Sequence, residues 1–308
     1  QVWYNSTSNV LKGFGAQGAV SWSSGGDLTT GRKQMSGAGS GTTSGLAFGG
    51  RAVNPTALDV SETYDGTTWT EGNNITQARF TGAGFGTATA AIYVTGFGFP
   101  TATIYTNSET YDGTSWTEGN NINVGRGYLA GCGTTTGGLA MGGYIGTPLQ
   151  RMNIVEDYDG TSWSEVGDLS PPGINSLAAA VQGTPSAALV FMGYSSPGPS
   201  DRTESFDGST WTEVNNLNTA RANGSGSGTQ TAALAIGGSD PTGELANVES
   251  WNGTSWTETS YDLGTGRYWG AACGSSTTAL AFGGSDPSVT AATEELGQAP
   301  AIKTFTSS

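Results

Sequence analysis

The sequence predicts an all-β protein, a six-bladed β-propeller built from four-stranded antiparallel blades. Three observations support this fold class. A segment containing an aromatic residue, Asp-Gly and tryptophan recurs along the chain; its copies lie 45 to 48 residues apart; and 51 of the 308 residues are glycine, accompanied by abundant threonine and serine. Intervals of this length are typical of four-stranded propeller blades, and this composition disfavours helices.

The repeat is clearest in SETYDGTTWTEGNN (61–74) and SETYDGTSWTEGNN (108–121). We interpret the whole chain, 1–308, as a single domain in which the repeats cover about 19–295, with short extensions at each end. Every copy is marked by a tryptophan, and AVSW at Trp22 is a degenerate copy. The repeat tryptophans, which we expect to pack between blades, are Trp22, Trp69, Trp116, Trp163, Trp211 and Trp256.

Each unit contains four predicted strands, a to d. Strand a is rich in glycine and alanine and should surround the central axis. Strand b is a continuous apolar run such as GLAFGG, ending at Gly50, which predicts burial on both faces. Strand c follows a variable loop and ends at Asp-Gly. This dipeptide predicts a tight hairpin with both central residues at positive φ, leading into strand d with the tryptophan.

The ends of the chain predict how the ring closes. The last unit supplies strands a to c, from about Tyr268 to Glu295, but no tryptophan strand after them, whereas Ala19 to Ser23 is a strand d without its own partners. We therefore expect this N-terminal strand to complete the last blade and remove the sheet edge. The C-terminal segment AIKTFTSS competes for the same place.

The two cysteines test the number of blades. Cys132 and Cys273 each lie six residues after a repeat arginine, so both occupy the same position of strand a, three units apart. In a ring of six blades they lie on opposite sides of the channel. Because the Cα atoms of a disulfide lie within about 7 Å of each other, we expect two free thiols.

Composition excludes several classes of function. The balance of 11 basic and 25 acidic residues gives a net charge of −14, which disfavours binding to nucleic acid or to an anionic membrane, and the apolar runs are too short for membrane insertion. The chain has no histidine, which removes Ser-His-Asp and Cys-His nucleophile systems and imidazole metal sites. We therefore expect no catalytic residue set, no cofactor and no metal.

The double glycine after strand b, the aromatic-Asp-Gly hairpin, the tryptophan and the arginine about ten residues later together resemble the kelch repeat. This resemblance runs from about Trp22 to Glu295 and implies a propeller of the galactose oxidase type. The amino-acid usage of segments such as DGTSWTE and NNLNTAR is similar to that of kelch-like repeats in virion and tail-fibre proteins of marine bacteriophages. Galactose oxidase binds copper through histidines, which this chain lacks, and the hairpin lacks one residue of the sialidase Asp box.

Arginine recurs at the start of strand a, and the fourth unit carries Ser176 in its place. An anion-binding ring at the channel mouth is one interpretation. The structural interpretation is that each arginine pairs with a repeat carboxylate such as Glu71, Glu118, Glu165, Glu213 or Glu258 and fixes neighbouring blades. We favour structure, because catalytic groups are usually singular. The recurring arginines are Arg32, Arg79, Arg126, Arg221 and Arg267.

Carboxylates recur as well, seven and four residues before the tryptophans. Adjacent carboxylates of these two sets could form a glycosidase pair, or they could be ordinary strand and turn acids. Calcium could bridge some of them, although no DxDxDG loop is present. The first set is Glu62, Glu109, Glu156, Glu204 and Glu249, and the second is Asp65, Asp112, Asp159 and Asp207.

Departures from the repeat are the better candidates for function. Aromatic residues in or beside the variable loops could stack on sugars or contact a protein partner, or they could cover an apolar edge. These candidates are Phe97, Phe99, Tyr105, Tyr144, Tyr194, Tyr268 and Trp269.

We expect a non-enzymatic structural or receptor-binding propeller in a virion or another extracellular assembly. Its expected partners are other virion or assembly proteins and cell-surface glycans, bound through loops on one rim. The alternatives are a glycan-active hydrolase of sialidase-like type and a kelch-type protein-interaction adaptor.

Overall fold

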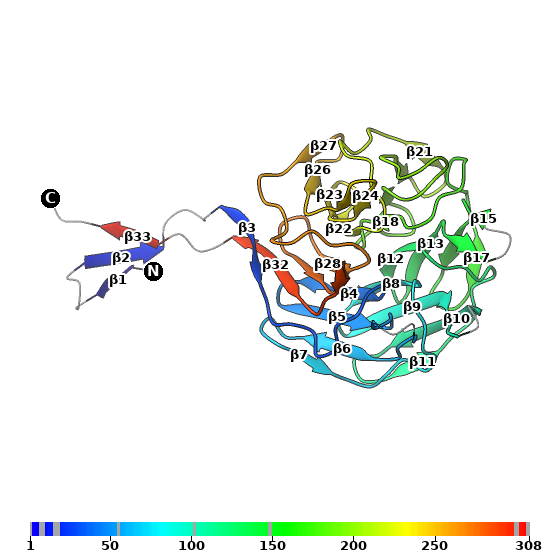
Figure 1. The fold of residues 1–308 in the computed structure, drawn as a ribbon, viewed down its shortest axis with the longest axis horizontal. Helices are drawn as coiled ribbons and strands as arrows, with labels where there is room; N and C mark the ends of the chain where they lie inside the picture. Colours follow the sequence, from blue (N-terminus) through cyan, green and yellow to red (C-terminus); the bar gives the residue numbers. More distant parts are fainter. Residues whose placement is uncertain are drawn as a thin grey trace.

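The computed structural model describes residues 2–5, 10–14, 19–53, 56–100, 103–146, 150–298 and 302–305. All regular elements in this part of the chain are β-strands. Six four-stranded antiparallel sheets follow one another around a ring (Figure 1). Strand-a residues of the six blades line the channel at its centre. The predicted fold class, a six-bladed propeller, is confirmed.

In every blade the strand order from the channel outward is a, b, c, d. Blade 1 consists of β4 (Ser36–Gly41), β5 (Ser44–Phe48), β6 (Ser61–Tyr64) and β7 (Trp69–Glu71). Blade 2 consists of β8 (Ala83–Thr87), β9 (Ala90–Phe97), β10 (Ile104–Tyr111) and β11 (Trp116–Glu118). Blade 3 consists of β12 (Ala130–Thr134), β13 (Gly137–Met141), β16 (Val155–Tyr158) and β17 (Trp163–Glu165). Blade 4 consists of β18 (Ala178–Ala179), β19 (Ala188–Phe191), β20 (Thr203–Phe206) and β21 (Trp211–Glu213). Blade 5 consists of β22 (Ser225–Thr229), β23 (Ala232–Ile236), β26 (Val248–Trp251) and β27 (Trp256–Glu258). Blade 6 consists of β28 (Ala271–Gly274), β29 (Ala279–Phe282), β32 (Thr293–Gln298) and β3 (Val20–Ser24).

Shorter strands lie outside the blades. Three loops between strands b and c contain two-stranded hairpins, in blades 3, 5 and 6, and a separate sheet has the order β1-β2-β33. Their bounds are β14 (Tyr144–Ile145), β15 (Gln150–Arg151), β24 (Ser239–Asp240), β25 (Gly243–Glu244), β30 (Ser285–Asp286), β31 (Ser288–Val289), β1 (Val2–Asn5), β2 (Val10–Phe14) and β33 (Ile302–Phe305).

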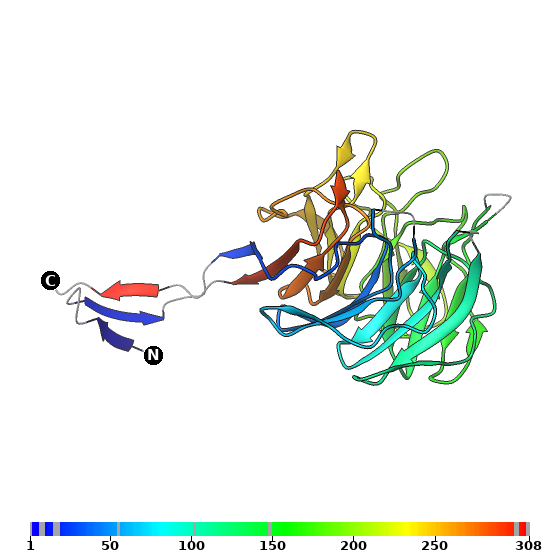
Figure 2. The ribbon, with the colours of Figure 1, turned by 60° about the horizontal axis from the view of Figure 1, so that its bottom comes forward.

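The ring closes through the N-terminal strand, as predicted. β3 pairs antiparallel with β32, with Trp22 opposite Leu296, and supplies strand d of blade 6. Two views show β3 and β32 side by side where the chain enters and leaves the ring (Figures 1 and 2). Of the competing segment AIKTFTSS the structure describes only Ile302–Phe305, which pairs with β2 instead.

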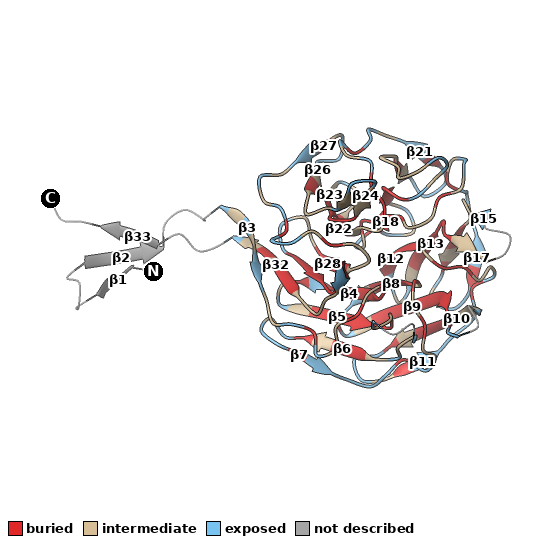
Figure 3. Ribbon diagram, in the orientation of Figure 1, coloured by how far each residue is buried: buried red, intermediate tan, exposed pale blue. Residues whose placement is uncertain are grey.

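Burial follows depth in the blade. Strand b is buried on both faces, with Leu46, Ala47 and Phe48 fully covered, whereas strand d buries its tryptophan and exposes the next two residues (Figure 3). Among the residues described, buried side chains form six hydrophobic clusters, each spanning two adjacent blades. The core is therefore a set of interfaces between blades, which explains why a single blade could not bury its apolar faces alone.

The tryptophan of strand d packs against strand b of the preceding blade. The ring centroids of Trp69 and Phe282 are 4.9 Å apart, and those of Trp116 and Phe48 are also 4.9 Å apart. Trp69 Nε1 donates to Thr293 Oγ1 at 2.9 Å, in strand c of the preceding blade. Thr203 accepts from Trp256 in the same way. In the other four blades the residue of strand c that corresponds to Thr293 is serine or valine. The tryptophan N–H groups that face these residues are buried and have no hydrogen-bond partner among the described residues; they belong to Trp22, Trp116, Trp163 and Trp211.

We expect the strand-c residue that faces the tryptophan N–H to affect the free energy of unfolding. Thr293→Val should lower the free energy of unfolding by about 1–3 kcal/mol, because it leaves a buried N–H unpaired without changing side-chain shape. Ser61→Thr, opposite Trp116, should raise it by about 0.5–1.5 kcal/mol, since the extra methyl group restricts the hydroxyl rotamer. Urea unfolding measures both changes. Loss of stability in Ser61→Thr would contradict the shared register.

The Asp-Gly hairpins differ from the predicted turn. Tyr64 pairs with Trp69, so four residues form the loop, and only Gly66 has positive φ, at 99°. The Asp65 carboxylate accepts the N–H groups of Thr67 and Thr68 at 2.8 and 2.9 Å. A side-chain cap therefore replaces the backbone geometry of a two-residue turn. These backbone hydrogen bonds, with help from the Thr67 hydroxyl, lower the pKa of Asp65 to about 2.

The capped turns make stability pH-dependent. Hydrogen bonds also lower the pKa of the aspartates in the next three hairpins, Asp112, Asp159 and Asp207. A depressed pKa contributes stability above the unfolded value of 3.8, and this contribution is lost as the pH falls toward 2. A variant with asparagine at all four positions should lose stability less steeply over this range in acid titrations of folding. Asn252, which caps the fifth turn through the same two N–H groups, is the native precedent.

The predicted free thiols are confirmed. Cys132 and Cys273 are unpaired and fully buried, in β12 and β28, which are separated by three blades in either direction around the ring. Burial raises the pKa of each thiol to about 12. We expect neither cysteine to react with a disulfide reagent near pH 8 in the native protein and both to react in denaturant. Rapid labelling of the native protein would contradict this.

Candidate functional site

Two kinds of segment meet on one rim of the ring, which we call the loop rim: the loops between strands b and c, and the connectors leading into strand a. Isolated bridges join them in all six blades, with partners Lys33 and Arg51, Phe80 and Phe97, Gly127 and Tyr144, Asn175 and Tyr194, Ala222 and Ser239, and Tyr268 and Ser285. The opposite rim carries the Asp-Gly turns. The variable loops thus surround one mouth of the channel.

At this mouth, one residue from each connector contributes to a closed circle of backbone hydrogen bonds. The N–H of each residue donates to the carbonyl of its counterpart in the preceding blade, at distances of 2.7–3.0 Å. Each residue has positive φ, between 54° and 61°. We call this circle the mouth ring; its members are Gln34, Thr81, Tyr128, Ser176, Asn223 and Trp269.

The side chains of the mouth ring line a cavity of about 130 Å³ whose walls are strand-a residues such as Gly84, Gly131 and Ala179. Gln34 is 4% exposed, and its Nε2 donates to the Tyr128 hydroxyl at 3.0 Å. Its Oε1 is buried without a hydrogen-bond partner. Trp269 Nε1 donates to Asn223 Oδ1 at 2.8 Å. The mouth therefore combines fixed backbone geometry with six different side chains.

The mouth ring corrects the alignment of the fourth unit. Ser176 belongs to the mouth ring, two residues beyond the arginine position, and Ile174 occupies the arginine position itself. The Ile174 carbonyl accepts from Gly143 N, as the Arg79 carbonyl accepts from Gly50 N. The length of the unit does not reveal where its extra residue lies, which explains the error.

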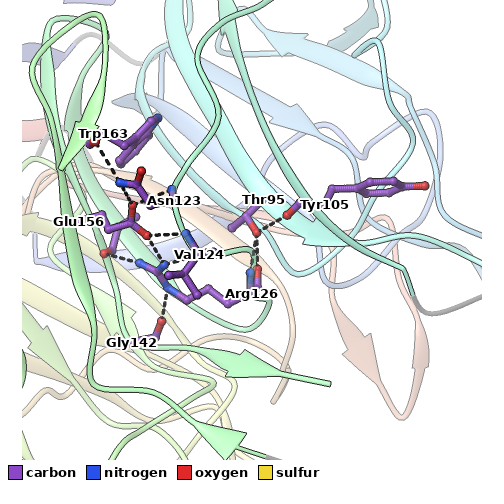
Figure 4. Close-up of polar contacts among 9 residues, drawn as sticks. Thr95, Tyr105, Asn123, Val124, Arg126, Gly142, Glu156 and Trp163 are labelled. Carbon is purple, nitrogen blue, oxygen red and sulfur yellow. Dashed lines mark hydrogen bonds and ion pairs between the residues drawn. The ribbon is translucent and has the colours of Figure 1, made fainter. Parts of the chain in front are cut away.

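The repeat arginines form buried ion pairs, but with other carboxylates than Glu71, Glu118, Glu165, Glu213 and Glu258. Arg126 Nη1 lies 2.6 Å from Glu156 Oε1, and its Nε donates to the Gly142 carbonyl oxygen (Figure 4). Nη2 of the same guanidinium donates to the Ala140 carbonyl oxygen. Burial lowers the pKa of Arg126, while Glu156 opposes the shift. The observed partners are Glu62, Glu109, Glu156, Glu249 and Glu294.

The depth of each strand in the blade explains why the arginines pair with the glutamates of strand c and not with those of strand d. Glu62 and Glu71 face each other across strands c and d. Strand d is the outermost strand, so Glu71 is exposed, whereas Glu62 lies one strand closer to the channel and is fully buried. Glu156 additionally accepts from the Asn123 side chain at 2.8 Å. The arginines and their partners thus fasten each connector to its own blade.

Aromatic rings from blades 6, 2 and 3, with Arg51 of blade 1 between them, form an arc along the loop rim. Tyr268 and Trp269 have ring centroids 4.5 Å apart, and Arg51 lies between Trp269 and Phe80, with its Cζ 5.9 and 5.3 Å from the two centroids. The arc continues through Phe97 to Tyr128 and Tyr144, with centroid separations of 5.9–6.3 Å. We call these residues the aromatic arc: Tyr268, Trp269, Phe80, Phe97, Tyr128 and Tyr144.

Of the seven aromatic candidates from the sequence, Phe97, Tyr144, Tyr268 and Trp269 belong to this arc. Phe97 is only 6% exposed and is more buried than the other three. Phe99 and Tyr194 are exposed, and Arg151 stacks on the Tyr194 ring at 5.3 Å. Tyr105 accepts a hydrogen bond from Gln77 through its hydroxyl, and its ring points away from the Arg126 network (Figure 4).

Sequence reasoning missed Gln34, Tyr128, Lys33, Arg51 and Phe80. The signal for the mouth ring was present: the position two residues after the repeat arginine holds a different amino acid in every unit, inside an otherwise regular segment. Lys33 and Arg51 were detectable as cations that do not occupy the repeat arginine position.

Within the described residues, no three His, Cys, Asp or Glu side chains gather in a group that could hold a metal ion. No helix long and apolar enough to cross a membrane occurs in the described part of the chain. No protein-family model matches the chain, and no curated protein is similar to it in sequence. The fold and the site therefore define a six-bladed β-propeller with a distinct loop rim.

Proposed function

We propose that this protein is a non-enzymatic recognition propeller that binds glycans through its loop rim. The observation that carries the proposal is the aromatic arc around the channel mouth. The repeat holds the rest of the molecule nearly uniform, including the turns of the opposite rim, but gives the loop rim six different mouth-ring side chains and loops of different lengths. Aromatic faces beside hydrogen-bonding groups are suited to sugars, whose C–H faces stack on rings and whose hydroxyls need polar partners.

The placement of the repeat acids supports binding without hydrolysis. A glycosidase needs two carboxyl groups that reach the scissile bond. Glu62, Glu109 and Glu156 are fully buried and engaged by arginines. The turn aspartates serve as caps on the opposite rim, and hydrogen bonds depress their pKa, whereas a general acid requires a raised one.

We propose a virion or another extracellular assembly as the setting, with other assembly proteins as partners. This part rests on the resemblance of DGTSWTE and NNLNTAR to kelch-like repeats of phage virion and tail-fibre proteins. A kelch-type adaptor is the rival, and a dominant protein partner at the loop rim with no glycan binding would favour it.

The test combines a glycan array with imaging of the native particle. We expect the protein to bind host-surface glycans, and Tyr144→Ala and Tyr194→Ala to weaken binding at least tenfold. Thr161→Ala, an exposed change on the opposite rim, is the matched control and should bind normally. Glycan turnover abolished by Glu156→Gln, or a native protein that is a free cytosolic monomer, would overturn the proposal.

A further inference from the structure

Two positive charges face each other at the start of blade 1. Lys33 and Arg51 are directly paired residues, joined by reciprocal backbone hydrogen bonds of 3.0 and 2.9 Å. Like charges placed directly opposite in a ladder repel each other and destabilise it. The other five blades carry no charged residue at either of these positions. This cation pair is therefore a departure from the repeat that stability does not explain.

Neither cation has a carboxylate partner in the described part of the chain. The other basic residues whose side chains the structure describes form ion pairs with glutamate, except Arg151. Arg51 is half-buried, and its Nε is buried without a hydrogen-bond partner. Burial and the charge of Arg51 lower the pKa of Lys33. In a protein of net charge −14, this pair remains unneutralised by the protein itself.

The surroundings of the pair form a site with several kinds of contact. Lys33 Nζ lies 5.0 Å from the Trp269 ring centroid, and the Arg51 guanidinium lies between Trp269 and Phe80. Cation–π contacts hold both charges on the aromatic surface. Gln34 is adjacent in the chain, 96% buried, and lines the cavity at the channel mouth; its buried Oε1 has no hydrogen-bond partner among the described residues.

We propose that the Lys33–Arg51 pair binds the carboxylate of an acidic sugar, a uronic or sialic acid, at the seam of blades 6, 1 and 2. The guanidinium pairs with the carboxylate through its free N–H groups, and Lys33 adds a second positive charge. The apolar face of the sugar stacks on the exposed part of Trp269 or Phe80. This inference rests on the proposed function and specifies its ligand class.

The experiment titrates the whole protein with an oligomer of galacturonic acid and with its methyl ester, which lacks the negative charge and keeps the sugar ring and its hydroxyl groups. We expect the acid to bind at least tenfold more tightly than the ester, and added salt to lower the affinity for the acid. Lys33→Gln combined with Arg51→Gln should remove this preference. The charge-conserving variant Lys33→Arg with Arg51→Lys should keep most of it. Inorganic phosphate is titrated separately.

A second measurement separates a binding role from a structural one. Because the pair is repulsive in the free protein, the double glutamine variant should be as stable as the native protein or more stable in urea unfolding. A large loss of stability would instead assign the pair a structural role and overturn the inference.

The remaining outcomes are distinguishable. Equal binding of acid and ester, unaffected by the double glutamine variant, would overturn the acidic-sugar inference and leave the proposed function intact. Phosphate binding as tight as that of the oligomer would show a simple anion site and also overturn it. Failure of both the oligomers and the glycan array to bind would overturn the proposed function as well.

Discussion

Replacing Arg79 by isoleucine should lower the free energy of unfolding by about 3–5 kcal/mol, because it leaves Glu109 buried without its cation. Arg79 is fully buried; it pairs with Glu109, and its Nη2 donates to the Tyr93 carbonyl at 3.0 Å. Its Cζ also lies 4.3 Å from the Tyr93 ring centroid. Urea unfolding at neutral pH measures the loss.

Blade 4 provides the matched control, since it has Ile174 at the arginine position. There the cation comes from Arg202, two residues before Glu204, at 3.1 Å. Asn107 lies two residues before Glu109. Arg79→Ile combined with Asn107→Arg rebuilds the blade-4 arrangement, and we expect it to recover about half of the lost stability. A loss below about 1 kcal/mol in Arg79→Ile would show that the pair contributes little.

The second large effect concerns the double glycine after strand b. Gly238 has φ of 109°, and a Cβ there would lie 2.8 Å from the Ala222 carbonyl oxygen. We expect Gly238→Ala to lower the free energy of unfolding by about 3–5 kcal/mol, since backbone strain and overpacking add. All six blades have glycine at this second position, with φ between 96° and 128°.

The preceding glycine is the control. Gly237 has φ of 57°, a value that other residues can adopt, and two blades have Thr95 or Met192 there, with φ of 55° and 52°. A Cβ at Gly237 would also lie close to backbone, 2.7 Å from the Arg267 carbonyl oxygen, so crowding affects both variants and only the strain of φ distinguishes them. Gly237→Ala should therefore lower the free energy of unfolding by less than Gly238→Ala does. Thermal and urea unfolding of the two variants compare them directly. Equal losses would contradict the assignment of the second glycine to a conformation that only glycine tolerates.

The sequence predicted the ring because the same side-chain types recur at a regular interval along the chain. The recurring tryptophans defined six units, and the unpaired strand before Ser24 predicted the closure with β32. The partners of the arginines were not predictable, because Glu62 and Glu71 differ in depth within the blade and not in sequence character. The turn geometry was missed because the Asp65 side chain accepts the hydrogen bonds that a tighter backbone turn would make.

The candidate site was predicted only in part. Variable loops identified Tyr144, Tyr268 and Trp269. The mouth ring is held by backbone groups, so its trace in the sequence is only a position that varies from unit to unit within a regular segment. Its residues share positive φ and a circle of peptide hydrogen bonds, although their side chains have nothing in common. The cation pair became visible only when the structure placed Lys33 opposite Arg51 and left both without a carboxylate.

The closure of the ring through β3 also determines how the propeller responds to mechanical force. Val20 and Gln298 are directly paired, at the point where the chain enters and leaves the ring. A pull on the two connecting segments therefore separates β3 from β32 one residue pair at a time, from this end inward, instead of shearing all their hydrogen bonds together. Peeling requires less force than shearing. Tension across both segments would open the ring at this seam, whereas attachment through one segment alone would leave every blade unloaded.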